Sequence, residues 1–238
     1  RRLARDKIQR SPKPVKSQHH NRSGHTMLTL LLNGHIALFA ILLLAIIVSL
    51  SLHEFGHAQA ATLLGDDTAR RMGRLTVNPV AHIDPLGLLM VVLVGFGYAR
   101  PVPFNPTNMR RRWAPAAVAA AGPGMNLLLA VVGVNLLALG AQAGGVAGSR
   151  EAVLTLTILA QINVLLMLFN LLPLGPLDGH YILSWLLPPR LGQRYDHFNA
   201  RHGTQAFLVL ILLSVMGVPV FRFLASFADR VLPLLVVV

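Results

Sequence analysis

Residues 27–57 read MLTLLLNGHIALFAILLLAIIVSLSLHEFGH, an apolar run that ends in two histidines and a glutamate. The run before His53 is longer than the ~20 apolar residues that a helix needs to cross a bilayer. The mean hydropathy of the chain is +0.59. Only 13% of its residues are charged, against about 25% in a soluble domain. These features predict an integral membrane protein. The presence of three ionisable side chains at the end of such an apolar run therefore needs a physical explanation.

Further apolar segments at residues 114–140, 152–172 and 204–238 predict a helical protein. They do not show the alternation that transmembrane β-strands require. We therefore expect an all-α polytopic membrane protein, a transmembrane helix bundle of about four to six segments. Residues 85–99 are apolar but short for a span, which favours a re-entrant or interfacial element. Residues 70–84 alternate loosely, so a short strand-like element or loop is expected after the first core helix.

The first apolar segment, residues 27–64, is too long for a single straight span. As one helix it would be about 57 Å long at 1.5 Å per residue. A bilayer core is only ~30 Å thick, so the helix is expected to tilt or to break near Asn33 and Gly34. Gly65 is expected to end it. A second break is expected near Gly217, in the C-terminal segment.

The net charge of +12 does not indicate nucleic-acid binding, because no recognition motif accompanies it. Eight of the 21 Lys and Arg residues lie in residues 1–26, which predict a basic disordered tail. The others cluster between apolar segments, as basic residues do in membrane proteins that contact a lipid bilayer. Residues 27–238 are expected to form a single membrane-embedded domain.

The arginines leave two topologies open. If residues 85–99 do not cross, the 65–112 region and the 188–203 loop share one side, opposite Arg150. The positive-inside bias then places the end that carries His53 near the cytoplasm. If residues 85–99 cross, the tail is cytoplasmic instead. The first arrangement gathers ten arginines on one side: Arg70, Arg71, Arg74, Arg100, Arg110, Arg111, Arg112, Arg190, Arg194 and Arg201.

Acidic residues are scarce, and two of the nine are unusual. Glu54 and Asp178 interrupt strongly apolar stretches and have no cation nearby in the sequence. A carboxylate at membrane depth costs at least about 2.5 kcal/mol, so such residues face a partner inside the protein. Glu54 comes with His53 and His57, and Asp178 is the natural candidate to join them.

The spacing of these residues predicts a zinc site. His53 and His57 lie at i and i+4, on one face of a helix, where two imidazoles can bind one Zn²⁺. Glu54 lies about 100° around the helix, as the general base of an HExxH motif does. The chain has no cysteine, so Asp178 is the expected third ligand, with His180 as a substitute. A diiron site would need several such histidine pairs, and the chain has one.

Three motifs in this order resemble the site-2 protease family of intramembrane zinc metalloproteases. The resemblance covers about residues 35–190, and two further stretches look like its compact prokaryotic branch without a PDZ domain. The motifs are HEFGH at 53–57, AGPGMN at 121–126 and NLLPLGPLDG at 170–179, and the further stretches are GRLTVNPVAHIDPLG at 73–87 and GFGYARPVPFNP at 95–106.

The resemblance implies one Zn²⁺ per chain, held by the two histidines and Asp178, with Glu54 as the catalytic base. It also implies that Asn126 and Asn170 lie near the active site and bind the substrate backbone or the oxyanion. Helix–helix hydrogen bonds are the alternative for both asparagines. The implied reaction is hydrolysis of peptide bonds in or near transmembrane segments of membrane proteins. The implied location is a bacterial or archaeal cell membrane, with several membrane passes.

A divalent-metal transporter is the alternative function, with His53, His57 and Asp178 as a transit site. A transporter needs no base at Glu54 and usually shows repeated segments, and the chain shows no internal repeat. A catalytically inactive scaffold is disfavoured by the intact motif. The oligomeric state and the substrate stay open.

Overall fold

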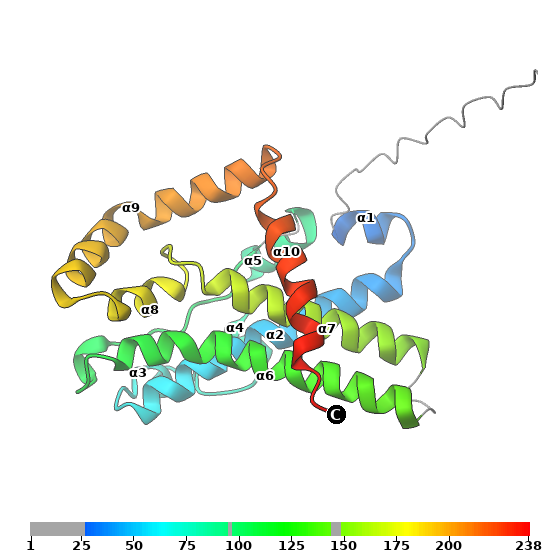
Figure 1. Ribbon diagram of the computed structural model, residues 1–238, viewed down its shortest axis with the longest axis horizontal. Coiled ribbons are helices and arrows are strands. Elements are labelled where there is room, and N and C mark those ends of the chain that lie inside the picture. Colours follow the sequence, from blue (N-terminus) through cyan, green and yellow to red (C-terminus); the bar gives the residue numbers. More distant parts are fainter. Residues whose placement is uncertain (1–26, 95–96, 144–148) are drawn as a thin grey trace, which may run out of the picture.

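The computed structural model describes residues 27–94, 97–143 and 149–238, and it confirms the all-α architecture (Figure 1). The expected tail, residues 1–26, lies outside the described residues. No strand occurs in the described part of the chain. The helices are α1 (Met27–Leu32), α2 (Ile36–Leu63), α3 (Thr68–Arg71), α4 (Pro79–His82), α5 (Pro85–Val94), α6 (Ala114–Ala143), α7 (Arg150–Asn170), α8 (Gly179–Leu186), α9 (Pro189–Val215) and α10 (Val220–Val231), with 3₁₀ turns at Pro106–Asn108 and Leu232–Leu235.

Three of the described helices, α2, α6 and α7, are long and apolar enough to cross a membrane. They pack against one another and form the centre of the molecule, and α10 crosses them on one side (Figure 1). Their outer faces carry exposed leucines such as Leu44, Leu128 and Leu136. Apolar surface of this kind is costly in water and suits lipid, as expected for an integral membrane protein.

The predicted break at Asn33 and Gly34 is confirmed, because α1 ends at Leu32 and α2 begins at Ile36. With 28 residues, α2 is about 42 Å long, still longer than a ~30 Å bilayer core. The segment ends before Gly65, as expected.

Of the two alternatives expected for residues 70–84, the short strand-like element is wrong, and the loop is correct for part of the stretch. Helical turns and loops occupy this stretch, which begins within α3 and contains α4 near its end. Asn78 caps α4 by accepting a 3.1 Å hydrogen bond from the N–H of Val80, and Pro79 takes the first helical position. These helix-start signals outweigh a loose alternation. The next helix, α5, has 10 residues and is about 15 Å long, which confirms that it is too short to span.

The C-terminal region confirms one expectation and corrects another. The predicted break near Gly217 separates α9 from α10. The expected loop at residues 188–203 is wrong, because α9 runs from Pro189 through this polar stretch into the apolar one. A helix has no reason to end where its composition changes, as long as its polar half stays in water. The side chains of Arg190, Arg194 and Arg201 are exposed.

Small residues bring the central helices close enough to build a site. Ala130 of α6, Val164 of α7 and Ala228 of α10 form one buried cluster. Gly56 of α2 faces Ala121 of α6 so closely that a Cβ there would lie 2.8 Å from the carbonyl oxygen. Small residues of this kind allow close backbone approach between membrane helices. The contact places the AGPGMN stretch of α6 beside the HEFGH turn of α2.

Candidate active site

The structure brings the three predicted ligands together. His53 and His57 project from successive turns of α2, and Asp178 ends the turn that joins α7 to α8. The helix α7 stops at Asn170, so the following irregular residues are free to aim this carboxylate at α2. Among the described residues, this is the one group of three or more His, Asp or Glu side chains placed to hold a metal ion.

The hydrogen bonds behind the imidazoles fix which nitrogen faces the centre. Nδ1 of His53 lies 2.6 Å from Oδ1 of Asn126, and Nδ1 of His57 lies 2.8 Å from the carbonyl oxygen of Val118. Both oxygens accept, so each neutral imidazole carries its proton on Nδ1. The two Nε2 lone pairs therefore face each other across 3.0 Å and also face Asp178. When both imidazoles are neutral, their two lone pairs and the negative charge of Asp178 converge on one point, an arrangement that a bound cation stabilises.

The distances fit a zinc ion. Bonds of 2.0–2.1 Å to a tetrahedral zinc place neighbouring ligand atoms about 3.3 Å apart. Here the two Nε2 atoms are 3.0 Å apart, and the carboxylate oxygens of Asp178 lie 3.3 Å from His53 and 3.4 Å from His57. Oδ2 of Asp178 is buried and accepts no hydrogen bond from the described residues. Three ligands of this type leave a fourth position open, as in catalytic zinc sites.

Glu54 follows the predicted ligand His53 in α2, but its side chain is held by a different part of the molecule. Its Oε2 accepts a 2.8 Å hydrogen bond from the backbone N–H of Val102, in the loop between α5 and α6. Within the described residues, no hydrogen bond reaches Oε1. The carboxylate is therefore held at one oxygen, and the other remains available to a water molecule, as a general base requires.

A cavity of about 770 Å³ opens onto this group. His53, His57, Glu54 and Asp178 all line it, and most of the other lining side chains are apolar. The lining comes from α2, α5, α6, α7, α8, α9 and α10, together with the loop between α5 and α6 and the turn between α7 and α8. A large apolar cavity with a few convergent polar groups is the usual form of a binding site.

Asn126 lies behind the site, and it is absent from the cavity lining. Its side chain is fully buried. While its Oδ1 holds His53, its Nδ2 donates to Oδ1 of Asn163 at 2.8 Å and to the carbonyl oxygen of Ser49 at 3.4 Å. This geometry favours a role in orienting the imidazole. Contact with substrate or oxyanion stays a prediction for this residue.

Asn163 and Ser49 belong to the site, although the sequence analysis missed both. Nδ2 of Asn163 donates to Oγ of Ser49 at 2.8 Å and to the carbonyl oxygen of Leu159 at 2.8 Å. Together with Asn126 they form a fully buried network from α2, α6 and α7. The available signal was an asparagine in the middle of an apolar helix, a position where a polar group needs a partner.

Two other predicted residues, Asn170 and His180, lie at the edge of the site or outside it. Asn170 lines the cavity and donates from Nδ2 to the carbonyl oxygen of Leu166 at 3.0 Å. His180 is not part of the metal-binding group; its Nδ1 lies 2.7 Å from the carbonyl oxygen of Leu177. His82 is fully buried and braces a loop, with Nε2 2.7 Å from the carbonyl oxygen of Thr76.

Comparison with known proteins identifies the family. The family model of Peptidase family M50 matches residues 41–145 and 141–214. YwhC of Bacillus subtilis (strain 168), a protein named as a zinc metalloprotease, is 39% identical over 204 residues, which cover 84% of this chain and 92% of YwhC. Rip2 of Mycolicibacterium smegmatis, named in the same way, is 31% identical over 188 residues, covering 76% of this chain and 69% of Rip2.

Rip2 of Mycobacterium tuberculosis (strain H37Rv) is also 31% identical over 188 residues, which cover 76% of this chain and 70% of that protein. No solved structure matches the chain. The chain belongs to peptidase family M50, and it is a zinc metalloprotease of the site-2 type. This family membership decides against a divalent-metal transporter.

Proposed function

We propose that this protein is an intramembrane protease of a bacterial or archaeal cell membrane, one that hydrolyses peptide bonds in or near transmembrane segments of other membrane proteins. The observation that carries the proposal is the position of the site. The HEFGH turn belongs to α2, one of the three helices able to cross a membrane, and it faces an apolar cavity lined by α7 and α10. A cavity of this character accepts an apolar polypeptide segment.

The chain's own residues supply the binding and proton-transfer chemistry. His53, His57 and Asp178 would hold one Zn²⁺ per chain, with both imidazoles fixed as the Nδ1–H tautomer. When bound, zinc supplies a Lewis acid that polarises the scissile carbonyl and makes a water molecule more acidic. Glu54 takes the proton from the attacking water at Oε1 and later delivers it to the leaving amine. Val102 keeps the other oxygen of Glu54 in place during both transfers.

The experiment that tests the proposal uses Glu54→Gln in purified protein reconstituted with a single-span membrane substrate. The amide keeps the shape of the carboxylate but cannot take a proton, so cleavage should fall by at least about 100-fold. Bound zinc, measured by elemental analysis, should stay at one ion per chain. The matched control is Glu151→Gln, on an exposed acid of α7, which should cleave like the wild type. Cleavage at the wild-type rate by Glu54→Gln would overturn the proposal.

A further inference from the structure

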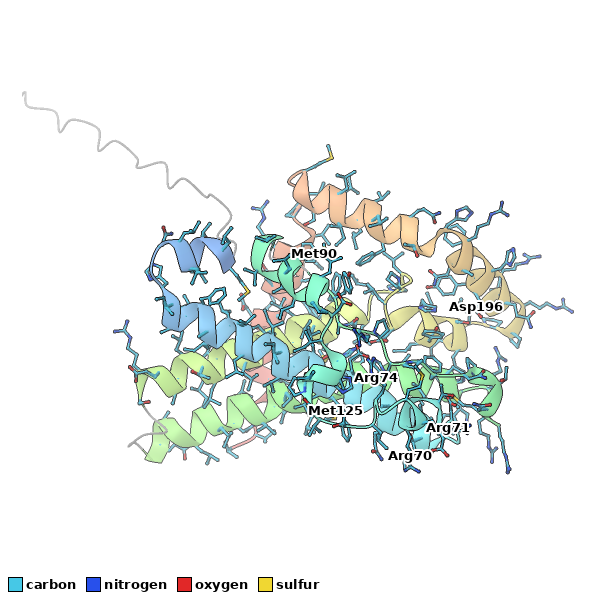
Figure 2. All side chains as sticks on the ribbon, turned by 180° about the vertical axis from the view of Figure 1, so that it is seen from behind. Arg70, Arg71, Arg74, Met90, Met125 and Asp196 are labelled. Atoms are coloured by element: carbon cyan, nitrogen blue, oxygen red, sulfur yellow. The ribbon has the colours of Figure 1, made fainter. Side chains whose placement is uncertain are left out.

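Arg74 is a buried cation that the proposed mechanism does not use. Arg74 is only 8% exposed, whereas Arg70 and Arg71 of the preceding helix α3 are exposed. Figure 2 shows Arg74 nearer the centre of the molecule than these two arginines. Among the described residues, no carboxylate lies within ion-pairing distance of Arg74. A buried charge without an ion pair is costly, so other contacts must hold it.

The guanidinium of Arg74 binds the backbone of the loop that carries Val102. Its Nη2 donates to the carbonyl oxygen of Arg100 and to that of Pro101, the latter at 3.3 Å. Burial lowers the pKa of the guanidinium; the negative charge of Glu54 opposes this effect, and the positive charge of Arg100 adds to it. Arg74 therefore acts on the two residues just before Val102, within the electrostatic reach of Glu54.

Two further contacts fix the same loop on either side of Val102. The N–H of Arg100 donates to the carbonyl oxygen of His82 at 2.8 Å. The N–H of Asn105 donates to Oδ2 of Asp66 at 2.6 Å. Because residues 101 and 103 are prolines without an N–H, Val102 is the one backbone donor between them. The loop is thus held at residues 100, 101 and 105, and between these anchors the N–H of Val102 donates to Glu54.

Helix ends place both charged anchors, Asp66 and Arg74. Gly65 follows α2 with φ +101° and Gly73 follows α3 with φ +69°, in the left-handed region that favours glycine. In each case the next residue bonds back to the helix: Asp66 to the carbonyl oxygen of Ala61 and Arg74 to that of Ala69, both at 2.9 Å. This is the Schellman arrangement of a helix C-terminus. The chain turns sharply there, and the charged side chain that follows is directed toward the loop.

We propose that Arg74 is a positioning residue for Glu54: it fixes Arg100 and Pro101 so that the N–H of Val102 holds Oε2 and leaves Oε1 for water. The assignment of a role in proteolysis rests on the proposed function. Without the guanidinium, the carbonyl groups of Arg100 and Pro101 lose their shared donor, and the loop loses one of its anchors. Val102 moves with them, and the base is no longer fixed.

The test follows the Val102 amide directly, by hydrogen exchange of the zinc-loaded protein in detergent micelles. In Arg74→Ala the amide should exchange at least about tenfold faster than in the wild type, because a hydrogen bond to a charged group is lost. Exchange in α2 and α6 should not change. Arg71→Ala is the matched control, since it removes an exposed arginine two residues before Gly73, and it should leave the Val102 amide unchanged.

A second measurement separates positioning from substrate binding. In Arg74→Ala, kcat should fall by about 100-fold, as displacement of a catalytic group does, with KM and zinc content close to wild type. Wild-type kcat, or a loss confined to KM, would overturn the proposal. So would a Val102 amide that exchanges at the wild-type rate, or faster exchange throughout α2 and α6, which marks a global role in folding.

Arg74→Lys keeps the test valid if the alanine variant does not fold. Lysine retains the charge, but its rotatable ammonium lacks the fixed in-plane geometry of the guanidinium Nη2, which donates to both carbonyl groups. The Val102 amide should again exchange faster while α2 and α6 keep their protection, and unchanged exchange would overturn the proposal. The exchange measurement needs no substrate, so it stands even if Glu54→Gln overturns the proposed function.

Discussion

Two neighbouring residues of α2, His53 and Glu54, depend on two different parts of the molecule. The imidazole of His53 rests on a network of buried side chains from the three central helices, through Asn126 and Asn163. The carboxylate of Glu54 rests on a backbone N–H from a loop outside these helices, at Val102. The ligand side is thus built inside the helix bundle, and the base side is built from loops packed against its end.

The difference has a physical basis. Inside an apolar bundle, every polar atom must find a partner within the protein, so a fully satisfied network is rigid and specifies one arrangement. A loop has spare backbone groups and can offer an N–H to a neighbouring side chain. Loops open more readily than packed helices, however, and need anchors to hold one conformation. Asp66 and Arg74 supply such anchors on the base side.

The largest expected effect disrupts the ligand side without substituting a ligand residue. In Gly122→Ala, the new Cβ would lie 2.5 Å from Cε1 of His57 and 2.7 Å from Cε1 of His53. Both imidazoles must move, so zinc affinity should fall by more than the about 10–100-fold that loss of an outer partner causes. Competition with a fluorescent zinc chelator measures this affinity.

Gly124→Ala is the matched control for Gly122→Ala, in the same AGPGMN stretch of α6. A Cβ at Gly124 meets no atom within 4 Å. Zinc affinity should stay at the wild-type value, and helix stability should rise by about 0.5–1 kcal/mol. If both substitutions weaken zinc binding equally, the helix backbone rather than the space beside the imidazoles controls the site.

The next effect tests the network behind His53. Asn163→Ala leaves Nδ2 of Asn126 with one weaker acceptor and Oγ of Ser49 without its donor. The imidazole of His53 loses a fixed partner, and zinc affinity should fall by about 10–100-fold. Asn135→Ala is the control, because this α6 asparagine bonds the C-terminal residues Leu235 and Val237 instead. Equal zinc affinity in the Asn163 variant and the wild type would show that the network does not support zinc binding.

The smallest effect concerns an anchor on the base side. Asp66 accepts hydrogen bonds from Thr68, from the N–H of Asn105 and from Nδ2 of Asn108. Burial alone would raise the pKa of this carboxyl, but these hydrogen bonds outweigh it and lower the pKa below its ordinary value of 3.8. Asp66→Asn should therefore lower the free energy of unfolding by about 1–3 kcal/mol at neutral pH.

The pH dependence of this effect follows from the lowered pKa. The ionised carboxylate stabilises the fold at pH values above 3.8, and its contribution is lost as the pH falls through the lower folded-state pKa. The difference between wild type and Asp66→Asn should shrink in that acidic range, as measured by thermal unfolding in detergent. Asp67→Asn, at a side chain that is 45% exposed, should show little difference at any pH. A difference for Asp66→Asn that does not depend on pH would contradict this reading.

Much of the helix pattern could be predicted from local sequence. The break at Asn33 and Gly34, the end of α2 before Gly65 and the shortness of α5 all follow from apolar length and turn residues. The strand-like reading of residues 70–84 failed because a weak alternation competed with a helix start at Asn78. The expected boundary between a polar loop at residues 188–203 and an apolar helix was wrong, because a change in polarity does not end a helix.

The sequence by itself determined the pair His53 and His57, because a spacing of four residues places two side chains on one helix face. The sequence also has few carboxylates, so Glu54 and Asp178 could be recognised within their apolar stretches. Only the tertiary structure decided which nitrogen each imidazole presents and what holds the base. Those contacts join residues 73 and 61 positions apart on the ligand side and 48 apart on the base side. No local period encodes such separations, since they depend on how closely the helices and their loops pack.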